Sequence, residues 1–528
     1  MSLSELIASL CRPGAFPAPV DDVEVRQTHI SAVFLGGDLA YKIKKPVQFS
    51  FLDFSTLELR KRFCELEVRL NRRLAPDVYL DVVPIALDDG TLRFEGTGEP
   101  VEWAVKMRRL PQAATLEILV QQDQVSVPQL QAIAQRLARF HRDAESNPRI
   151  SAFGRFEAVA RNLRENLAIA APLVGQTVAP AIFDRLTFLT EQKLLELQPT
   201  IEWRAAQGVP RDTHGDLHLD HVYLFPDRPS PSDLVIVDCI EFTERFRYTD
   251  PVADMAFLAM DLSFHGRPDL AKSFCDAYFE AAEDQTGRAL LPLYLSYRAA
   301  VRGKVDGLTL IEPEIPESER NAALARARGH WLLALHPLEE PLRRPWLILI
   351  SGLPGSGKST LAQGLAAAVG AKVIRSDVVR KELAGLSPTS SAPVPPGGGL
   401  YSADWNDRTY AECLRRAEQR LFLGERVIID ATFVEEGRRR VFLEAAVRWG
   451  VPALWLLCDS PSELIRQRLA ARHSDASDAD WTIYQTAAQR WESPGPMSLR
   501  SLHRLETTGT PEQGVAAAHA ILREAGFA

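Results

Sequence analysis

The chain has 528 residues, of which 46% are hydrophobic and 25% are charged. These proportions are typical of globular proteins and exclude a disordered or fibrous one, and the length predicts two to four domains. A formal net charge of −8 gives no long-range attraction for a polyanion, which argues against nucleic acid as a partner and favours small molecules.

Neither the cysteines nor the apolar runs point to secretion or to a membrane. The six cysteines are scattered without C-x-x-C or zinc-ligand spacing, as in reduced cytoplasmic proteins. The first residues, MSLSELIASLCRPG, are typical of a short amphipathic helix and not of a signal peptide, and no apolar run reaches membrane-spanning length. We therefore expect a cytoplasmic protein without membrane association.

The N-terminal part begins with strand patterns and continues with helical ones. From Gln27 to Lys45 the pattern predicts a hairpin, in which the runs ISAVFL and LAYKIKK are joined by a Gly-Gly-Asp turn. Ser55 and Glu58 have the spacing of a capping box and predict the start of a helix. Two more strand-like runs follow, and helical periodicity then extends in pieces to about residue 206. This order predicts an α+β domain.

Two acids in the N-terminal half have the placement that phosphoryl transfer needs. The polar segment HGDLHLDH contains Asp216, and the following apolar run LVIVD ends at Asp238. An acid in a loop and an acid at the end of the next strand could place a base for an acceptor beside a metal ligand for ATP. The spacing indicates a candidate phosphotransfer site.

A proline-rich tract separates two kinds of pattern. HPLEEPLRRP, residues 336–345, has three prolines and alternating charge, which is typical of a linker. We therefore expect one domain over residues 1–335 and a second over residues 346–528. In the second part continuous apolar runs alternate with helical segments, which predicts an α/β domain with a parallel sheet covered on both faces.

The second domain opens with a phosphate-binding loop, because a strand-like run is followed by GLPGSGKST. Glycines allow backbone N–H groups to point at phosphate oxygens, Lys358 would reach the β- and γ-phosphates, and the Ser359 hydroxyl would ligate Mg²⁺. The competing interpretation is a glycine-rich turn with a chance lysine. The residues expected to contact the nucleotide are Gly352, Leu353, Pro354, Gly355, Ser356, Gly357, Lys358, Ser359 and Thr360.

Two further acids follow strands of the expected parallel sheet. Asp430 ends the apolar run VIID, where a carboxylate would hold hydrated Mg²⁺. Asp377 follows the second strand and is the candidate base for an acceptor hydroxyl, with a helix N-cap as the alternative. Arg468 and Arg472 lie one helical turn apart and could close over the transferring phosphate, although a solvated basic face gives the same pattern.

The low-complexity insert LSPTSSAPVPPGGGLYS, residues 386–402, is interpreted either as a mobile loop beside this site or as a passive surface insertion.

Four segments of the second domain, the phosphate loop, SDVVRKEL, VIIDATF and RLAAR, together resemble the P-loop small-molecule and nucleic-acid 5′-kinases. That resemblance covers roughly the last third of the chain and implies that Asp377 activates the acceptor hydroxyl.

HGDLHLDH followed by IVDCIEF resembles the aminoglycoside phosphotransferase and choline kinase group, which is related to the protein kinases. The resemblance implies that Asp216 is the catalytic base, that Asp238 ligates Mg²⁺ and that Asp254 braces the catalytic loop. His221 stands where this group usually has a metal-binding Asn, so His221 is a candidate metal ligand, although imidazole is a poorer partner than an amide oxygen for Mg²⁺.

The same resemblance places a phosphate-anchoring lysine on the second strand of the early hairpin. Lys42 and Lys44 share one face of that strand, and the A-x-K spacing favours Lys42. On a helical wheel Glu67 flanks the buried stripe of the next helix and is the expected partner of the lysine, with a surface ion pair as the alternative. VKMRRL, which contains Met107, would be the hinge that contacts adenine.

In this order the whole chain resembles the two-domain bacterial bifunctional aminoglycoside phosphotransferase/ATP-binding protein family. The resemblance implies a kinase-like N-terminal domain, a P-loop NTPase C-terminal domain, ATP and Mg²⁺ as cofactors, and transfer of the γ-phosphate to a small-molecule hydroxyl such as that of a sugar, aminoglycoside or nucleoside. Alternatively, only the P-loop half is catalytic, as a small-molecule or polynucleotide 5′-kinase, and the N-terminal half is a degenerate sensor.

Overall fold

The computed structural model describes residues 2–49, 52–312, 315–387, 399–471, 477 and 479–527. By its internal contacts the chain divides into two compact units. The first comprises residues 1–162 and 196–295, and the second comprises residues 163–195 and 296–528. The second unit therefore includes helical segments that precede the expected linker.

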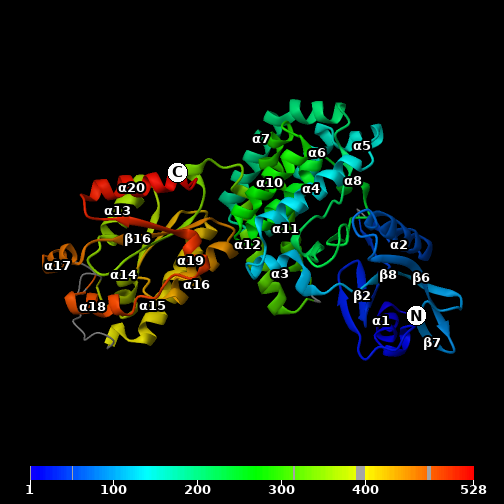
Figure 1. Cartoon of the computed structure of the whole chain (residues 1–528), viewed down its shortest axis with the longest axis horizontal. Helices are drawn as coiled ribbons and strands as arrows, with labels where there is room; N and C mark the ends of the chain where they lie inside the picture. Colours follow the sequence, from blue (N-terminus) through cyan, green and yellow to red (C-terminus); the bar gives the residue numbers. More distant parts are fainter. Residues whose placement is uncertain are drawn as a thin grey trace. The chain divides into compact units, whose positions relative to one another are not determined.

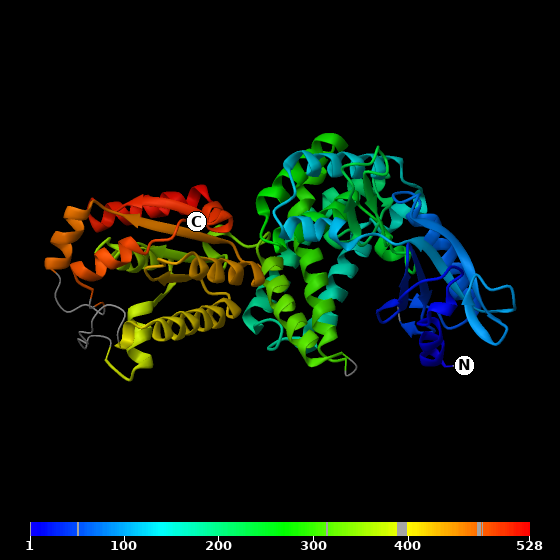
Figure 2. The same ribbon diagram turned by 60° about the horizontal axis from the view of Figure 1, so that its bottom comes forward.

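The first unit opens with a six-stranded antiparallel sheet in the order β1-β2-β3-β8-β6-β7, whose strands lie side by side in Figure 2. The predicted hairpin is present as β2 and β3, which pair from Ser31 opposite Lys44 to Gly36 opposite Leu39. The bounds of the strands are β1 Glu24–Gln27, β2 Ser31–Gly36, β3 Leu39–Lys44, β6 Tyr79–Asp88, β7 Thr91–Phe94 and β8 Pro100–Arg108.

Helix α2, Leu57–Asn71, packs on one face of this sheet against β8 and β6. The predicted capping box is wrong by one residue, because the N-cap is Thr56, whose hydroxyl accepts the N–H of Leu59. The reason is local: Asp53 accepts the backbone N–H of Ser55 and holds that residue in the preceding turn. The other face of the sheet is covered by α1, Leu3–Leu10, through an apolar cluster.

Helices make up most of the rest of the first half of the chain. α9 is almost entirely buried, so it has no polar face, whereas α4 and α10 pack against each other and each bury one stripe. The short antiparallel pair β10, Val222–Leu224, and β11, Leu234–Ile236, carries the segments with the predicted acids. The helices are α3 Leu116–Gln121, α4 Val127–Asp143, α5 Pro148–Phe153, α6 Phe156–Ala170, α7 Pro180–Ala206, α8 Glu244–Arg247, α9 Pro251–Phe264, α10 Pro268–Ala282, α11 Leu291–Thr309 and α12 Glu317–Leu335.

The second unit contains the predicted parallel sheet, in the order β14-β15-β13-β16-β17. Every residue of the central strand β13 is buried, as its continuous apolar run requires. α13 and α20 cover one face, and Figure 1 shows α14, α15 and α16 on the other side of the strands. The strands are β13 Leu347–Ser351, β14 Lys372–Arg375, β15 Val427–Asp430, β16 Ala453–Asp459 and β17 Leu502–Glu506.

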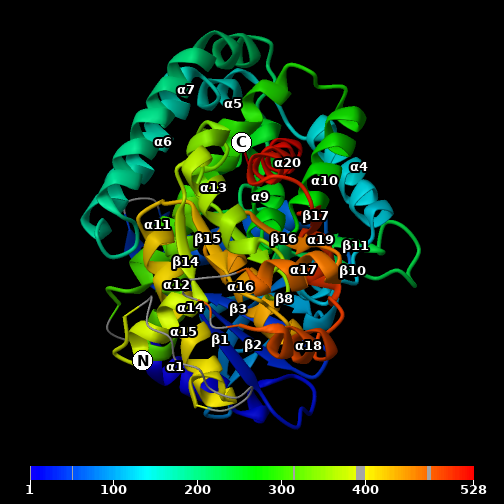
Figure 3. The ribbon, with the colours of Figure 1, turned by 90° about the vertical axis from the view of Figure 1, so that its left-hand side faces the viewer.

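Helices of this sheet domain begin and end at recognisable caps. α13 starts after Gly357, which has φ 88°, and stops at Gly370, as the sequence predicts. α14 and α15 lie side by side in both Figure 1 and Figure 3 and are in contact. The helices are α13 Lys358–Val369, α14 Ser376–Leu383, α15 Ala403–Phe422, α16 Glu436–Arg448, α17 Ser462–Ala470, α18 Trp481–Gln489, α19 Pro496–Ser501 and α20 Pro511–Glu524.

No described helix has both the length and the apolar content needed to cross a membrane. Most of the low-complexity insert, residues 388–398, lies outside the described residues, and so does Arg472.

Candidate active sites

The phosphate loop is held in a backbone conformation that side chains disfavour. Gly352, Gly355 and Gly357 have φ values of 145°, 82° and 88°. A Cβ on Gly352 would lie 2.5 Å from Ser356 Oγ and 2.6 Å from the carbonyl oxygen of Cys458, at the end of β16. The chain therefore passes too close to its neighbours for any residue but glycine, and the loop curls directly onto the N-terminus of α13.

Lys358, Ser359 and Asp430 meet at the C-terminal edge of the sheet. Asp430 is buried, and its Oδ1 has no hydrogen-bond partner among the described residues. Burial raises the pKa of the Asp430 carboxyl, and the Lys358 ammonium and a hydrogen bond from Ser359 oppose that rise only in part. A carboxylate oxygen and a hydroxyl oxygen side by side form a donor set that suits Mg²⁺.

Asp377 lies in the first turn of α14, close enough to Asp430 to affect its pKa. The N-cap of α14 is Arg375, so the alternative that Asp377 is the N-cap is wrong. Strand pairing brings the two ends together, because Arg375 is in register with Asp430 and its Nε lies 3.2 Å from Asp430 Oδ2. The neighbouring strands β14 and β15 thus place Asp377 and Asp430 at the same edge of the sheet.

Arg468 is tied to the loop that follows β17. Its guanidinium donates to the carbonyl oxygen of Thr507 at 2.6 Å and to Ser460 Oγ at 3.2 Å. The Thr507 hydroxyl donates to the carbonyl oxygen of Ser356 in the phosphate loop at 2.6 Å. Sequence analysis missed Thr507 and Ser460, because single hydroxyl residues in loops carry no motif.

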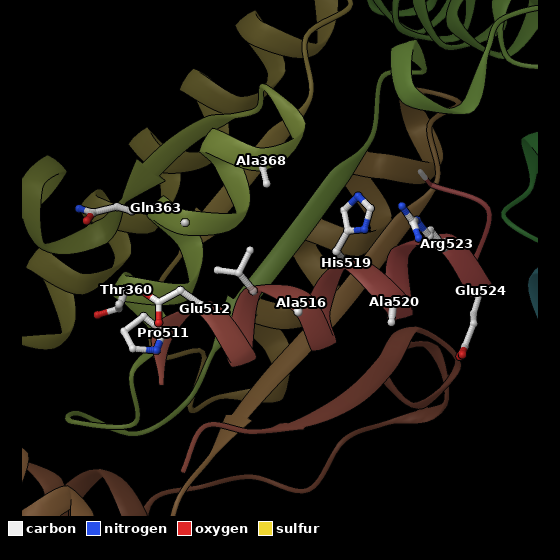
Figure 4. Close-up of a pocket in the computed structure, with 12 residues that line it drawn as sticks. Thr360, Gln363, Ala368, Pro511, Glu512, Ala516, His519, Ala520, Arg523 and Glu524 are labelled. Atoms are coloured by element: carbon white, nitrogen blue, oxygen red, sulfur yellow. The ribbon is translucent and has the colours of Figure 1, made fainter. Parts of the chain in front are cut away.

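A groove of about 970 Å³ runs between α13 and α20 (Figure 4). It adjoins the phosphate loop only through Thr360, and its lining is divided between small apolar residues and polar or charged ones. None of the acids or basic residues predicted for catalysis lines it. The groove is therefore not the phosphate site.

In the first unit, Lys42, Glu67 and Asp238 form a charge cluster in which Glu67 is buried and Asp238 is partly exposed. Lys42 Nζ lies 2.9 Å from Glu67 Oε1 and 2.5 Å from Asp238 Oδ1. The Glu67 side chain is fully buried, so the alternative of a surface ion pair is wrong. Asp238 has φ 64°, and its backbone N–H donates to the hydroxyl of Tyr79. The structure thus brings together Lys42 and Asp238, which are 196 positions apart in the sequence.

Lys44 and Glu241 extend this cluster. Lys44 Nζ contacts the second oxygen of Glu67 at 2.8 Å and also contacts Glu241. Burial alone raises the pKa of the Glu67 carboxyl, but the ammonium groups of Lys42 and Lys44 outweigh it and hold that pKa below its usual range. Sequence analysis missed Glu241, since nothing marks an acid three residues after Asp238 as the partner of a lysine on β3.

The loop that carries Asp216 is held in place by Asp254 of the buried helix α9. The buried Asp254 carboxylate accepts the backbone N–H groups of His214 and Gly215 at 3.1 and 2.8 Å and contacts His141 Nε2 at 3.0 Å. Asp261, also from α9, accepts the N–H of Leu219 at 2.9 Å. Two acids of one buried helix therefore hold the loop at both ends.

Asp216, His218 and His221 offer ligand atoms that lie within 4.8 Å of one another. His218 Nε2 is 3.2 Å from Asp216 Oδ2, and its Nδ1 contacts Asp220. His221 Nε2 is 3.6 Å from Asp238 Oδ2, so the loop reaches the lysine cluster. The imidazole of His221 therefore lies next to the Asp238 carboxylate that pairs with Lys42.

Met107 lies on β8 opposite Ala40 of β3, in an apolar cluster beside the lysine cluster. An apolar surface next to a phosphate-anchoring lysine is what an adenine ring needs. The buried members of this cluster are Leu35, Ala40, Cys64, Val68, Ala75, Val78, Tyr79, Val105, Met107 and Val235.

Family models match both halves of the chain. One, described as a phosphotransferase enzyme family, matches residues 54–291, and another, described as an AAA domain, matches residues 347–494. Similar full-length relatives are the uncharacterized proteins Rv2004c of Mycobacterium tuberculosis and Mb2027c of Mycobacterium bovis. Each is 35% identical over 513 residues, which cover 96% of this chain and 97% of the relative.

Solved structures resemble parts of the chain. A choline/ethanolamine kinase family protein from Mesorhizobium loti is 13% identical with a TM-score of 0.36, and the match covers 64% of this chain and 99% of that chain. A gluconokinase from Sinorhizobium meliloti is 19% identical with a TM-score of 0.27, and the match covers 35% of this chain and 95% of that chain.

Proposed function

Because this chain belongs to the two-domain family that joins a phosphotransferase domain to a P-loop domain, it is an ATP-dependent phosphotransferase of the kinase type, and we propose that each domain binds its own ATP with a divalent cation. The acceptor is a small molecule with a hydroxyl group. The observation that carries this proposal is the presence of two separate lysine–carboxylate constellations, Lys358 with Asp430 and Lys42 with Asp238 and Glu67.

In the P-loop domain the backbone from Gly352 to Thr360 surrounds the phosphates and Lys358 neutralises the β- and γ-phosphate oxygens. Ser359 and Asp430 hold Mg²⁺, which the orphaned Oδ1 of Asp430 supports. Asp377 accepts the proton of the attacking hydroxyl. Arg468, next to the loop, stabilises the negative charge that spreads over the transferring phosphoryl group.

In the kinase-like domain Lys42 anchors the phosphates while Glu67 holds that lysine in place. Lys44, paired with Glu241, keeps Glu67 neutralised when Lys42 turns to the nucleotide. Adenine lies on the apolar surface that includes Met107. Asp238 binds the metal and Asp216 accepts the hydroxyl proton.

The first test is ATP consumption by the wild type, Asp216→Ala and Lys358→Ala, with a panel of sugars, aminoglycosides, nucleosides and short oligonucleotides. We expect each variant to lose a different step, and calorimetry at saturating Mg²⁺ to find two nucleotide sites per chain. One site per chain would contradict the proposal. Transfer to a 5′-hydroxyl oligonucleotide with strong salt dependence would instead identify a polynucleotide kinase.

The alternative function assigns catalysis to the P-loop half alone, with the N-terminal half as a sensor. His221 favours it, because an imidazole stands where the related phosphotransferases usually have a metal-binding amide. Under this alternative Lys358→Ala abolishes turnover of every acceptor and Asp216→Ala changes none of them.

A further inference from the structure

The orientation of His221 is fixed by its backbone neighbour. Its Nδ1 lies 2.9 Å from the carbonyl oxygen of Asp216. A carbonyl oxygen can only accept, so Nδ1 carries the proton of the neutral ring and Nε2 carries the lone pair. A backbone carbonyl on the far nitrogen is a common way in which proteins orient a metal-ligating histidine.

The lone pair of His221 faces the predicted metal ligand. Nε2 lies 3.6 Å from Asp238 Oδ2, and the Asp238 side chain is 43% exposed, so a cation can reach it. Two ligands at about 2.1 Å from one cation lie about 3.0 Å apart at a right angle and about 3.4 Å apart at a tetrahedral angle. The observed separation therefore needs only a small adjustment for both atoms to share one cation.

The neighbouring histidine, His218, is already in contact with carboxylates, so His221 is the candidate metal ligand of this loop. Both ring nitrogens of His218 already face carboxylates, Nε2 towards Asp216 and Nδ1 towards Asp220. Asp216 Oδ2 lies 4.0 Å from His221 Nδ1, the ring nitrogen that does not face Asp238. The donor set beside Nε2 is therefore one imidazole nitrogen with the carboxylate of Asp238.

Such a set differs from the one in the P-loop domain. There the donors are the oxygens of Asp430 and Ser359. Mg²⁺ takes oxygen ligands in a strict octahedron, whereas imidazole suits first-row transition cations, whose affinity for nitrogen donors rises from Mn²⁺ onward. One chain thus contains two candidate metal sites of different chemical preference.

We propose that His221 Nε2 and Asp238 together ligate a first-row transition divalent cation, so that the N-terminal site takes Mn²⁺ in preference to Mg²⁺. The inference rests on the proposed binding of a metal–nucleotide complex by the N-terminal domain. Under this proposal His221 determines which metal the N-terminal site prefers, and it is not a sign that the site is degenerate.

The test uses the full-length chain carrying Lys358→Ala and Asp430→Asn, which remove the lysine and the carboxylate of the P-loop site. Electron spin echo spectroscopy of Mn²⁺ with a non-hydrolysable ATP analogue should detect nitrogen coupling from an imidazole. His221→Asn should abolish the coupling and lower the ratio of Mn²⁺ to Mg²⁺ affinity by about tenfold or more. His519→Asn, on α20, is the matched control and should change neither.

The outcomes separate this inference from the proposed function. If the analogue binds with Mn²⁺ or Mg²⁺ but no nitrogen coupling appears, or if the coupling persists in His221→Asn, the ligand assignment is wrong and the nucleotide site stands. If this background binds the analogue with neither metal, the proposed function of the N-terminal domain is wrong, and the inference is wrong with it.

Discussion

The two candidate phosphate sites differ in which groups form them, backbone in one and charged side chains in the other. In the P-loop domain the site is mostly backbone, a run of glycines that curls onto α13, with Lys358 next in sequence. In the N-terminal domain the site is a cluster of charged side chains, with Lys42 and Lys44 on β3, Glu67 on α2 and Asp238 after β11. The first is specified locally, whereas the second exists only when distant segments meet.

The largest expected effect tests the ionic side of this comparison. Glu67→Ala removes the carboxylate that both Lys42 and Lys44 contact and leaves buried ammonium groups without it. We expect the free energy of unfolding of the first unit to fall by about 3–5 kcal/mol. Urea unfolding measures it. Glu65→Ala, at an exposed position of the same helix, should change it by less than about 0.5 kcal/mol.

The next effect tests the backbone side. Gly352→Ala places a Cβ 2.6 Å from the carbonyl oxygen of Cys458 at φ 145°, so the loop has to shift. We expect a loss of about 1–3 kcal/mol in stability and a loss of nucleotide binding at the P-loop site. Thermal unfolding and calorimetry test this. Gly437→Ala, on α16 with open space around it, should stabilise by about 0.5–1 kcal/mol, and equal behaviour of the two variants would contradict the argument.

A third effect is a dependence of the stability of the first unit on pH, through His265. Burial lowers the pKa of His265, but hydrogen bonds to Asp261 and Glu117 outweigh it and raise that pKa to about 10. Because the folded value lies above the ordinary value of about 6.5, this stabilisation is complete below pH 6.5 and is lost as pH rises towards 10, by at most about 1.4 kcal/mol per pH unit.

Urea unfolding midpoints at pH 6.5, 8 and 9.5 measure that loss, and His265→Gln should remove most of its pH dependence. If wild type and variant keep the same slope, His265 is not the group responsible.

The smallest effect concerns the contact between the phosphate loop and the loop after β17. Thr507→Val removes the hydroxyl that donates to the carbonyl oxygen of Ser356. We expect nucleotide affinity at the P-loop site to weaken by about 1 kcal/mol, or roughly fivefold. Titration with ATP and Mg²⁺ tests this, with Thr482→Val on α18 as the control at an exposed threonine.

Sequence patterns predicted the local features well. The hairpin of β2 and β3, the parallel strands and the stop of α13 at Gly370 are all present. These features depend on periodicity and on glycine, which are visible in a short window. The capping box at Ser55 failed because Asp53 competes for the same backbone N–H.

Other features of the sites could not be read from the chain. Nothing in the sequence indicates that Lys42 and Lys44 share Glu67, that Glu241 completes this cluster, or that Thr507 contacts the phosphate loop. Each of these contacts joins segments far apart in the chain, so its existence depends on how sheets and helices pack.

By itself the sequence determined that this protein has a P-loop with its lysine, a parallel sheet behind it and two acids in the N-terminal half. Only the tertiary structure decided which side chains neutralise one another and which way His221 points. The physical reason is that backbone conformation is governed by neighbouring residues, whereas the orientation and charge state of a buried side chain are governed by whatever group packing brings within a few ångströms.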